Sequence, residues 1–94
     1  MITDTTPLVE ALKAHKQITL TYAKENGEIV THTGGITEIG PNKKGNEVLW
    51  LWDTTLNDHI RQFLFGGIQS FQVLDTEYVD MFGWGFKLNG QLLI

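Results

Sequence analysis

The fold is decided by Gln17–Gly35, QITLTYAKENGEIVTHTGG, which predicts two strands joined by a tight turn. Apolar side chains alternate with threonines at its start, the period of two that is typical of a half-buried strand; they are Ile18, Leu20 and Tyr22. Asn26-Gly27 follows, and this dipeptide is typical of the positive φ angles in a hairpin turn. A return strand is therefore expected over residues 28–33, interrupted by a bulge or sharp bend at Gly34-Gly35, and residues 36–39 can continue it past the bend.

Short elements separated by turn residues flank this hairpin on both sides. A helix is expected over residues 7–15, because Thr6 can cap it and Pro7 suits its first position. Further strands are expected at residues 48–52, 59–65 and 68–74, with a terminal hairpin around Asn89-Gly90. The 94 residues therefore predict one domain, mainly β with a small α part, whose short strands and turns fit a small β-barrel.

The charge and the cysteine content exclude several classes of function. Eleven acidic and seven basic residues give a net charge of −4, which argues against strong non-specific binding of nucleic acid. The chain has no cysteine, so no disulfide or thiolate is available. The start of the sequence does not resemble a signal peptide, and no apolar run approaches the ~20 residues of a membrane helix. We expect a cytoplasmic protein with no membrane association.

No catalytic or metal-binding constellation stands out in the sequence. His15, His32 and His59 are far apart and lack the close spacing of metal ligands, so exposed or strand-face histidines are expected. Ser70, the only serine, has no nucleophile motif around it. The acidic pairs lie in or beside expected turns, where aspartate is favoured for backbone reasons. We therefore expect no metal, no cofactor and no enzymatic activity.

Arg61 is the most informative single residue of the chain. It is the only arginine, and it lies inside an expected strand. Its guanidinium presents a rigid fork of donors that suits a carboxylate or a phosphate. The alternative interpretation is a surface strand residue that pairs with Asp53 or Asp58.

Trp50 and Trp52 lie two residues apart in an apolar strand, so both side chains project from the same face. That face is either core or a stacking platform for a base or for the side chain of a partner. Leu49 and Leu51 occupy the opposite face and also favour burial. One of the two faces is therefore expected to be covered by the C-terminal residues or by a second subunit.

The C-terminal extension, residues 76–94, carries more apolar surface than a small monomer easily covers. Its large aromatic residues predict an interaction surface for a homodimer or for a larger protein partner; they are Tyr78, Phe82, Trp84 and Phe86.

Between Gly45 and Asp75 the chain carries a glycine, an aromatic-rich strand that ends in an acidic turn, an R-x-F motif, an isoleucine five residues on, and a strand ending V-L-D. These are Gly45, Val48–Asp53, Arg61-Gln62-Phe63, Ile68 and Val73-Leu74-Asp75. This segment resembles the WYL domain, an SH3-like β-barrel common in bacterial transcription regulators. The resemblance covers about residues 8–75 and implies an SH3-like β-barrel for this chain.

The resemblance implies a non-enzymatic regulatory domain that senses a ligand. Family members are thought to bind nucleotides or single-stranded nucleic acid through a basic cluster, of which Arg61 alone carries over. Arg61 would then anchor an acidic ligand or nucleotide in a site lined by Tyr22, Trp50, Trp52 and Phe63. The chain has no room for a helix-turn-helix, so it is not expected to be a complete repressor. The alternative function is a protein-interaction module that uses the aromatic C-terminal extension.

Overall fold

The computed structural model describes residues 4–54, 59–80 and 83–93, and for His59 it describes the backbone alone. One helix precedes an almost uninterrupted series of strands. In chain order the elements are α1 (Thr6–Lys13), β1 (Lys16–Ala23), β2 (Ile29–Pro41), β3 (Glu47–Asp53), β4 (His59–Leu64), the 3-10 helix η1 (Phe65–Gly67), β5 (Ile68–Glu77), β6 (Phe86–Leu88) and β7 (Gln91–Leu93).

The strands form one sheet in the order β4-β3-β2-β1-β5, with antiparallel pairing along this path. Off the path, β6 pairs parallel with β2, and β7 pairs antiparallel with β6. The predicted class is confirmed: the fold is mainly β, with an N-terminal helix and a C-terminal hairpin. β4 and β5 stand at the two ends of the path, and no ladder joins them among the described residues. Closure into a barrel therefore stays a prediction.

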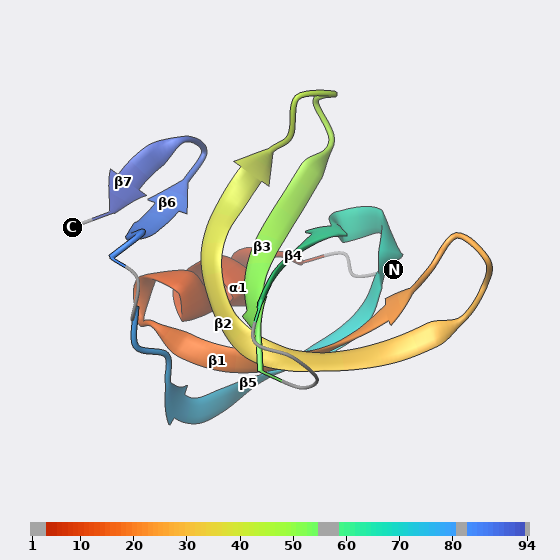
Figure 1. The fold of residues 1–94 in the computed structure, drawn as a ribbon, viewed down its shortest axis with the longest axis horizontal. Helices are drawn as coiled ribbons and strands as arrows, with labels where there is room; N and C mark the ends of the chain where they lie inside the picture. The colour runs from red at the N-terminus through yellow and green to blue at the C-terminus, as the bar shows by residue number, and fades with distance from the viewer. Residues whose placement is uncertain (1–3, 55–58, 81–82, 94) are drawn as a thin grey trace.

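β2 is a single strand of 13 residues that runs through the paired glycines, where the sequence predicted a bulge or bend with a continuation over residues 36–39. Its first half pairs with β1 and its second half pairs with β3. Figure 1 shows that β2 is strongly curved where its partner changes from β1 to β3. A Cβ at Gly34 would lie 1.9 Å from the carbonyl oxygen of Trp52, and one at Gly35 would lie 2.0 Å from Cγ of Tyr78. The two glycines therefore allow close packing within a continuous strand and do not end it.

α1 is shorter than predicted, and its cap lies one residue earlier. The N-cap is Thr5, and the backbone N–H of Thr6 donates to Oδ1 of Asp4 at 3.0 Å, which lowers the pKa of Asp4. The helix ends at Lys13 and His15 adopts a left-handed φ of 57°. This turn places the His15 ring on Phe86, with the ring centroids 3.9 Å apart and the planes at 9°.

The core lies between α1 and the concave side of the curved sheet. α1 contributes Leu8, Ala11 and Leu12, which share the apolar face predicted from their helical spacing. The sheet contributes residues that are almost fully excluded from solvent: Ile18, Leu20, Ile36, Leu49, Leu51 and Ile68. Burial of such side chains contributes about 1.5–3 kcal/mol each, so this cluster is the main source of stability.

The C-terminal extension packs on its own domain (Figure 1). β6 pairs with the end of β2 through Glu38↔Lys87 and Ile39↔Leu88. Tyr78 and Phe86 join the same core cluster, and the backbone N–H of Tyr78 donates to the carbonyl of His15 at 2.6 Å. The extension therefore completes the core of the chain that carries it.

Among the described residues, no helix has the length and apolar character needed to cross a membrane.

Candidate functional site

The site is built around Asp53, the last residue of β3, whose side chain is fully buried. Its Oδ2 atom accepts hydrogen bonds from Nδ1 of His32 and from Nε of Arg61, each at 2.6 Å. The sequence proposed Asp53 or Asp58 as the partner of Arg61, and the structure pairs Arg61 with Asp53. Asp58 lies outside the described residues. A buried carboxylate thus fixes two nitrogen-bearing side chains from two other strands.

Strand alternation explains why these three side chains meet. Asp53 shares its face of β3 with Leu49 and Leu51, so its carboxylate points to the interior side of the sheet. Arg61 is the register partner of Leu51, and Gly34, two residues after His32, is the register partner of Asp53. The three strands therefore bring the three side chains to one face.

Two of these side chains, His32 and Arg61, line a groove of about 650 Å³, large enough for a small ligand, and Asp53 lies behind them. The aromatic part of the groove is a continuous set of rings. Tyr22 meets Phe63 edge-on at 5.0 Å, and His32 is tilted against Phe63 at 5.1 Å. Lys24 also lines the groove and lies 4.0 Å from Glu28, an exposed pair that contributes little to stability.

The guanidinium of Arg61 is oriented and is still accessible. Its side chain is 30% exposed, whereas that of Asp53 is fully buried. Among the described residues its hydrogen bond is the one from Nε to Asp53, so the two Nη nitrogens keep their donors for another group. Two parallel N–H donors match the two oxygens of a carboxylate or a phosphate. The site can therefore bind an anion with a group that is already positioned.

The predicted ligand-binding residues divide between two faces of the sheet. Arg61, Tyr22 and Phe63 come together in the groove. Trp50 and Trp52 lie on the opposite face of β3, as alternation predicts. Trp52 is 7% exposed and is covered by Trp84, whose ring meets it edge-on at 5.4 Å. The extension therefore covers the Trp52 face of β3.

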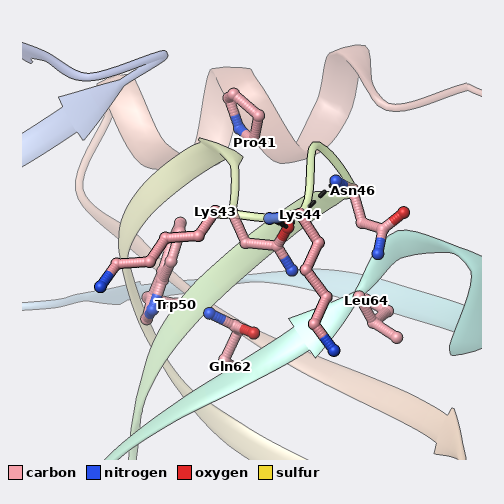
Figure 2. Close-up of a pocket in the computed structure, with 8 residues that line it drawn as sticks. Pro41, Lys43, Lys44, Asn46, Trp50, Gln62 and Leu64 are labelled. Atoms are coloured by element: carbon pink, nitrogen blue, oxygen red, sulfur yellow. Dashed lines mark hydrogen bonds between the residues drawn. The ribbon is translucent and has the colours of Figure 1, made fainter.

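Trp50 lies in a separate pocket of about 550 Å³. Figure 2 shows Lys43 and Lys44 extending from the β2–β3 loop over the face that carries Trp50, Gln62 and Leu64. The loop is held by Asn42, whose Oδ1 accepts the backbone N–H groups of Lys44 and Asn46 at 2.9 and 3.0 Å. This pocket has an aromatic floor and two basic side chains.

The residues predicted for protein interaction have different surroundings. Tyr78 and Phe86 are buried at 5% and 8% exposure, whereas Trp84 is 48% exposed. Burial raises the pKa of the Tyr78 hydroxyl, with the nearby Asp80 carboxylate as a second cause. Phe82 lies outside the described residues.

His32 is the site residue that the sequence did not identify. It was expected to be an exposed or strand-face histidine, because no second histidine lies at ligand spacing. In the structure it is 7% exposed and bonded to Asp53. Its position two residues before the glycine pair is the one available signal, since it places His32 on the inner side of the bend.

Within the described part of the chain, no group of three or more histidine or acidic side chains is placed to hold a metal ion. Ser70 is exposed on β5 opposite Thr21.

Comparisons of the chain with protein-family models, with curated proteins and with solved structures return no match.

Proposed function

We propose that this domain is a non-enzymatic, cytoplasmic ligand-sensing module that binds an acidic ligand or a nucleotide through Arg61. One observation carries the proposal: the buried Asp53 fixes Nε of Arg61, and the remaining guanidinium donors lie at a groove with aromatic walls. The WYL-like residue pattern between Gly45 and Asp75 supports the same proposal.

The geometry favours an anion because binding requires little reorganisation of the protein. Asp53 has already restricted the Arg61 rotamer, so less side-chain entropy is lost when a ligand binds. Lys24 supplies a second cationic group at the same groove. Tyr22 and Phe63 offer ring surfaces for the base of a nucleotide or for an apolar group, and such stacking contributes about 1–3 kcal/mol per base.

The experiment is a titration of isotope-labelled protein with AMP and, separately, with inorganic phosphate. Binding is followed through the NMR signal of the Arg61 Nε–H group and by calorimetry. We expect Arg61→Gln to weaken AMP binding at least tenfold, because it removes a charge-assisted bidentate contact (roughly 1.5–3 kcal/mol). Arg61→Lys is expected to be intermediate, since it keeps the charge and loses the fork.

Lys87→Gln is the matched control for loss of one positive charge. Lys87 is exposed on β6, and the groove does not include it. If Arg61→Gln and Lys87→Gln change the AMP affinity equally, the effect belongs to the net charge and the proposal is wrong.

A second candidate function is protein interaction through the C-terminal extension. Among the described residues of the extension, three apolar side chains are exposed: Val79 at 64%, Trp84 at 48% and Leu92 at 60%. We propose that they form a surface for self-association or for docking on a larger partner. Light scattering over a range of concentrations tests self-association, with Val79→Ser/Leu92→Ser as the disrupting variant and Ile29→Ser, 56% exposed on β2, as the control.

A further inference from the structure

β4 has an open edge next to the Arg61 groove. It pairs with β3 on one side and ends the path of the sheet on the other. The backbone N–H of Leu64 points away from β3, since it donates to the Tyr22 hydroxyl at 3.2 Å. Backbone groups alternate in an antiparallel pair, and the β3–β4 register has no shift, so Ile60 and Gln62 also direct their N–H and C=O groups outward.

The lining of the groove shows that it reaches this edge. Four consecutive residues of β4 line it, from Ile60 to Phe63. Side chains of a strand alternate between two faces, so a cavity on one face would be lined by every second residue. Contact with consecutive residues indicates that the groove is open to the backbone of β4. No described residue forms a backbone pair with Ile60 or Gln62 on that side.

β4 also lies between the Arg61 groove and the separate pocket of Trp50. Arg61 and Phe63 project to the groove side. Gln62 and Leu64 project to the opposite side, where they line the pocket of Trp50 (Figure 2). A strand added to β4 would therefore send its own side chains alternately toward the groove and toward the Trp50 pocket.

We infer that the ligand of this site is an extended acidic peptide segment that pairs with the open edge of β4. This inference rests on the proposed function, because it makes Arg61 the anchor of an acidic side chain of the peptide. The outward backbone groups of Ile60 and Gln62 match the donors and acceptors of an extended chain, and a nucleotide offers no comparable ladder of hydrogen bonds.

The charges on both sides of β4 select an acidic segment. Arg61 and Lys24 lie on the groove side, and Lys43 and Lys44 lie on the side of Trp50. Glu28 is the acidic side chain at the rim of the groove, and it lies 4.0 Å from Lys24. Four cationic side chains thus flank the edge of β4 in a chain whose net charge is −4.

The experiment measures binding of a short fluorescein-labelled peptide of alternating glutamate and valine by fluorescence anisotropy. The same peptide with N-methyl groups on alternate amides keeps its side chains and cannot form a full ladder. Gln62→Pro removes the outward N–H, at an edge position that tolerates proline. Gln62→Ala is its matched control, because it shortens the side chain and keeps the N–H. AMP is titrated in parallel with each variant.

We expect the peptide to bind, and we expect N-methylation, Gln62→Pro and Arg61→Gln each to weaken it roughly tenfold or more. Gln62→Ala should keep most of the peptide affinity, so the affinity ratio between Gln62→Pro and Gln62→Ala isolates the contribution of the backbone N–H. If Gln62→Pro does not fold, hydrogen exchange of the wild-type Ile60 and Gln62 amides takes its place, since both should be protected when the peptide binds.

Three results would overturn the inference. The first is equal binding of the N-methylated peptide. The second is AMP binding that depends on Arg61 with no binding of the peptide, which leaves the proposed function intact and identifies a nucleotide ligand. The third is protection of the Ile60 and Gln62 amides by protein concentration alone, which makes a second copy of the chain the occupant. Peptide pairing that is unaffected by Arg61→Gln instead contradicts the proposed function.

Discussion

At the scale of single residues, Asp53 combines a structural and a binding role. Its carboxylate is fully buried and compensates two donors, His32 and Arg61. We expect Asp53→Ala to lower the free energy of unfolding by about 3 kcal/mol, because it leaves both donors without their acceptor. Urea denaturation followed by tryptophan fluorescence measures this loss.

The control for Asp53→Ala is Asp75→Ala, because Asp75 is exposed on β5. A surface substitution of this kind should stay within about 0.5 kcal/mol of the wild type. Equal losses in the two variants would show that Asp53 stabilises the fold only through the overall charge balance.

The hydroxyl group of Tyr78 lowers the stability of the core. This hydroxyl is buried and has no hydrogen-bond partner among the described residues. Tyr78→Phe is therefore expected to raise the free energy of unfolding by about 1 kcal/mol at neutral pH. Tyr78→Ala should lower it by about 3 kcal/mol or more, since it removes the whole ring. A clear loss of stability in Tyr78→Phe would show that the hydroxyl has a favourable partner.

The raised pKa of Tyr78 gives this prediction a pH dependence. Folding favours the neutral hydroxyl, so the contribution of Tyr78 is intact below its usual pKa of 10.0 and is lost as the pH rises through the higher folded-state pKa. The advantage of Tyr78→Phe over the wild type should therefore grow above pH 10. Denaturation of both proteins at pH 7 and above pH 10 measures the difference.

The sequence predicted two residues of the candidate site, Arg61 and Asp53, and did not predict the third, His32. Arg61 was found because a lone arginine inside a strand is conspicuous, and Asp53 was one of its two proposed partners. His32 was missed because its contact with Asp53 crosses 21 residues and depends on the register of β2 with β3. Trp50 and Trp52 were assigned to the same site as Arg61, although alternation along β3 and β4 directs them to the other face.

At the scale of elements, β2 depends on two glycines at its bend. The sequence predicted most strands, because alternation and turn residues are local signals. It predicted a bulge or bend at Gly34-Gly35 with a continuation over residues 36–39. It did not show why glycine is needed there, since the reason is the approach of Trp52 and Tyr78 from distant parts of the chain. The end of α1 was also misplaced, because the left-handed turn at His15 is stabilised by Phe86.

Gly34→Ala tests the packing at this bend. Its Cβ would lie 1.9 Å from the backbone oxygen of Trp52, which cannot rotate away. We expect a loss of at least about 2 kcal/mol in the free energy of unfolding, from displacement of β3 against β2. Gly66→Ala is the control, because a Cβ there meets nothing within 4 Å and the change should be neutral or slightly stabilising. Similar stabilities of the two variants would contradict the close approach.

At the scale of the whole molecule, the C-terminal extension is part of the core. The composition of the extension predicts that its aromatic side chains are buried. It does not distinguish burial against a partner from burial against the sheet of the same chain. The structure places Tyr78 against Gly35 of β2 and stacks Phe86 on His15, just after α1, in the same chain. The parallel pairing of β6 with β2 has no local sequence signal, because it joins segments about fifty residues apart.

Truncation after Asp75 should consequently destabilise the domain and not merely change its oligomeric state. Loss of a buried aromatic side chain costs about 3–5 kcal/mol, and the truncation removes two of them from a domain with a typical stability of about 5–15 kcal/mol. We expect loss of the near-UV circular dichroism signal at room temperature. Leu92→Ser, at a position 60% exposed, should keep that signal. A truncated protein with native near-UV signal would show that the core is complete without the extension.

The pairing of β1 with β5 has a consequence for the speed of folding. Its innermost pair is Tyr22↔Ile68, so about half of the chain must be closed into a loop before the ladder gains any hydrogen bonds. Non-local pairing of this kind places small domains in the millisecond-to-second range, far slower than their hairpin turns form. The rate of refolding after rapid dilution from urea should therefore be limited by the pairing of β1 with β5. The β1–β2 hairpin should form earlier, before β5 pairs with the other edge of β1.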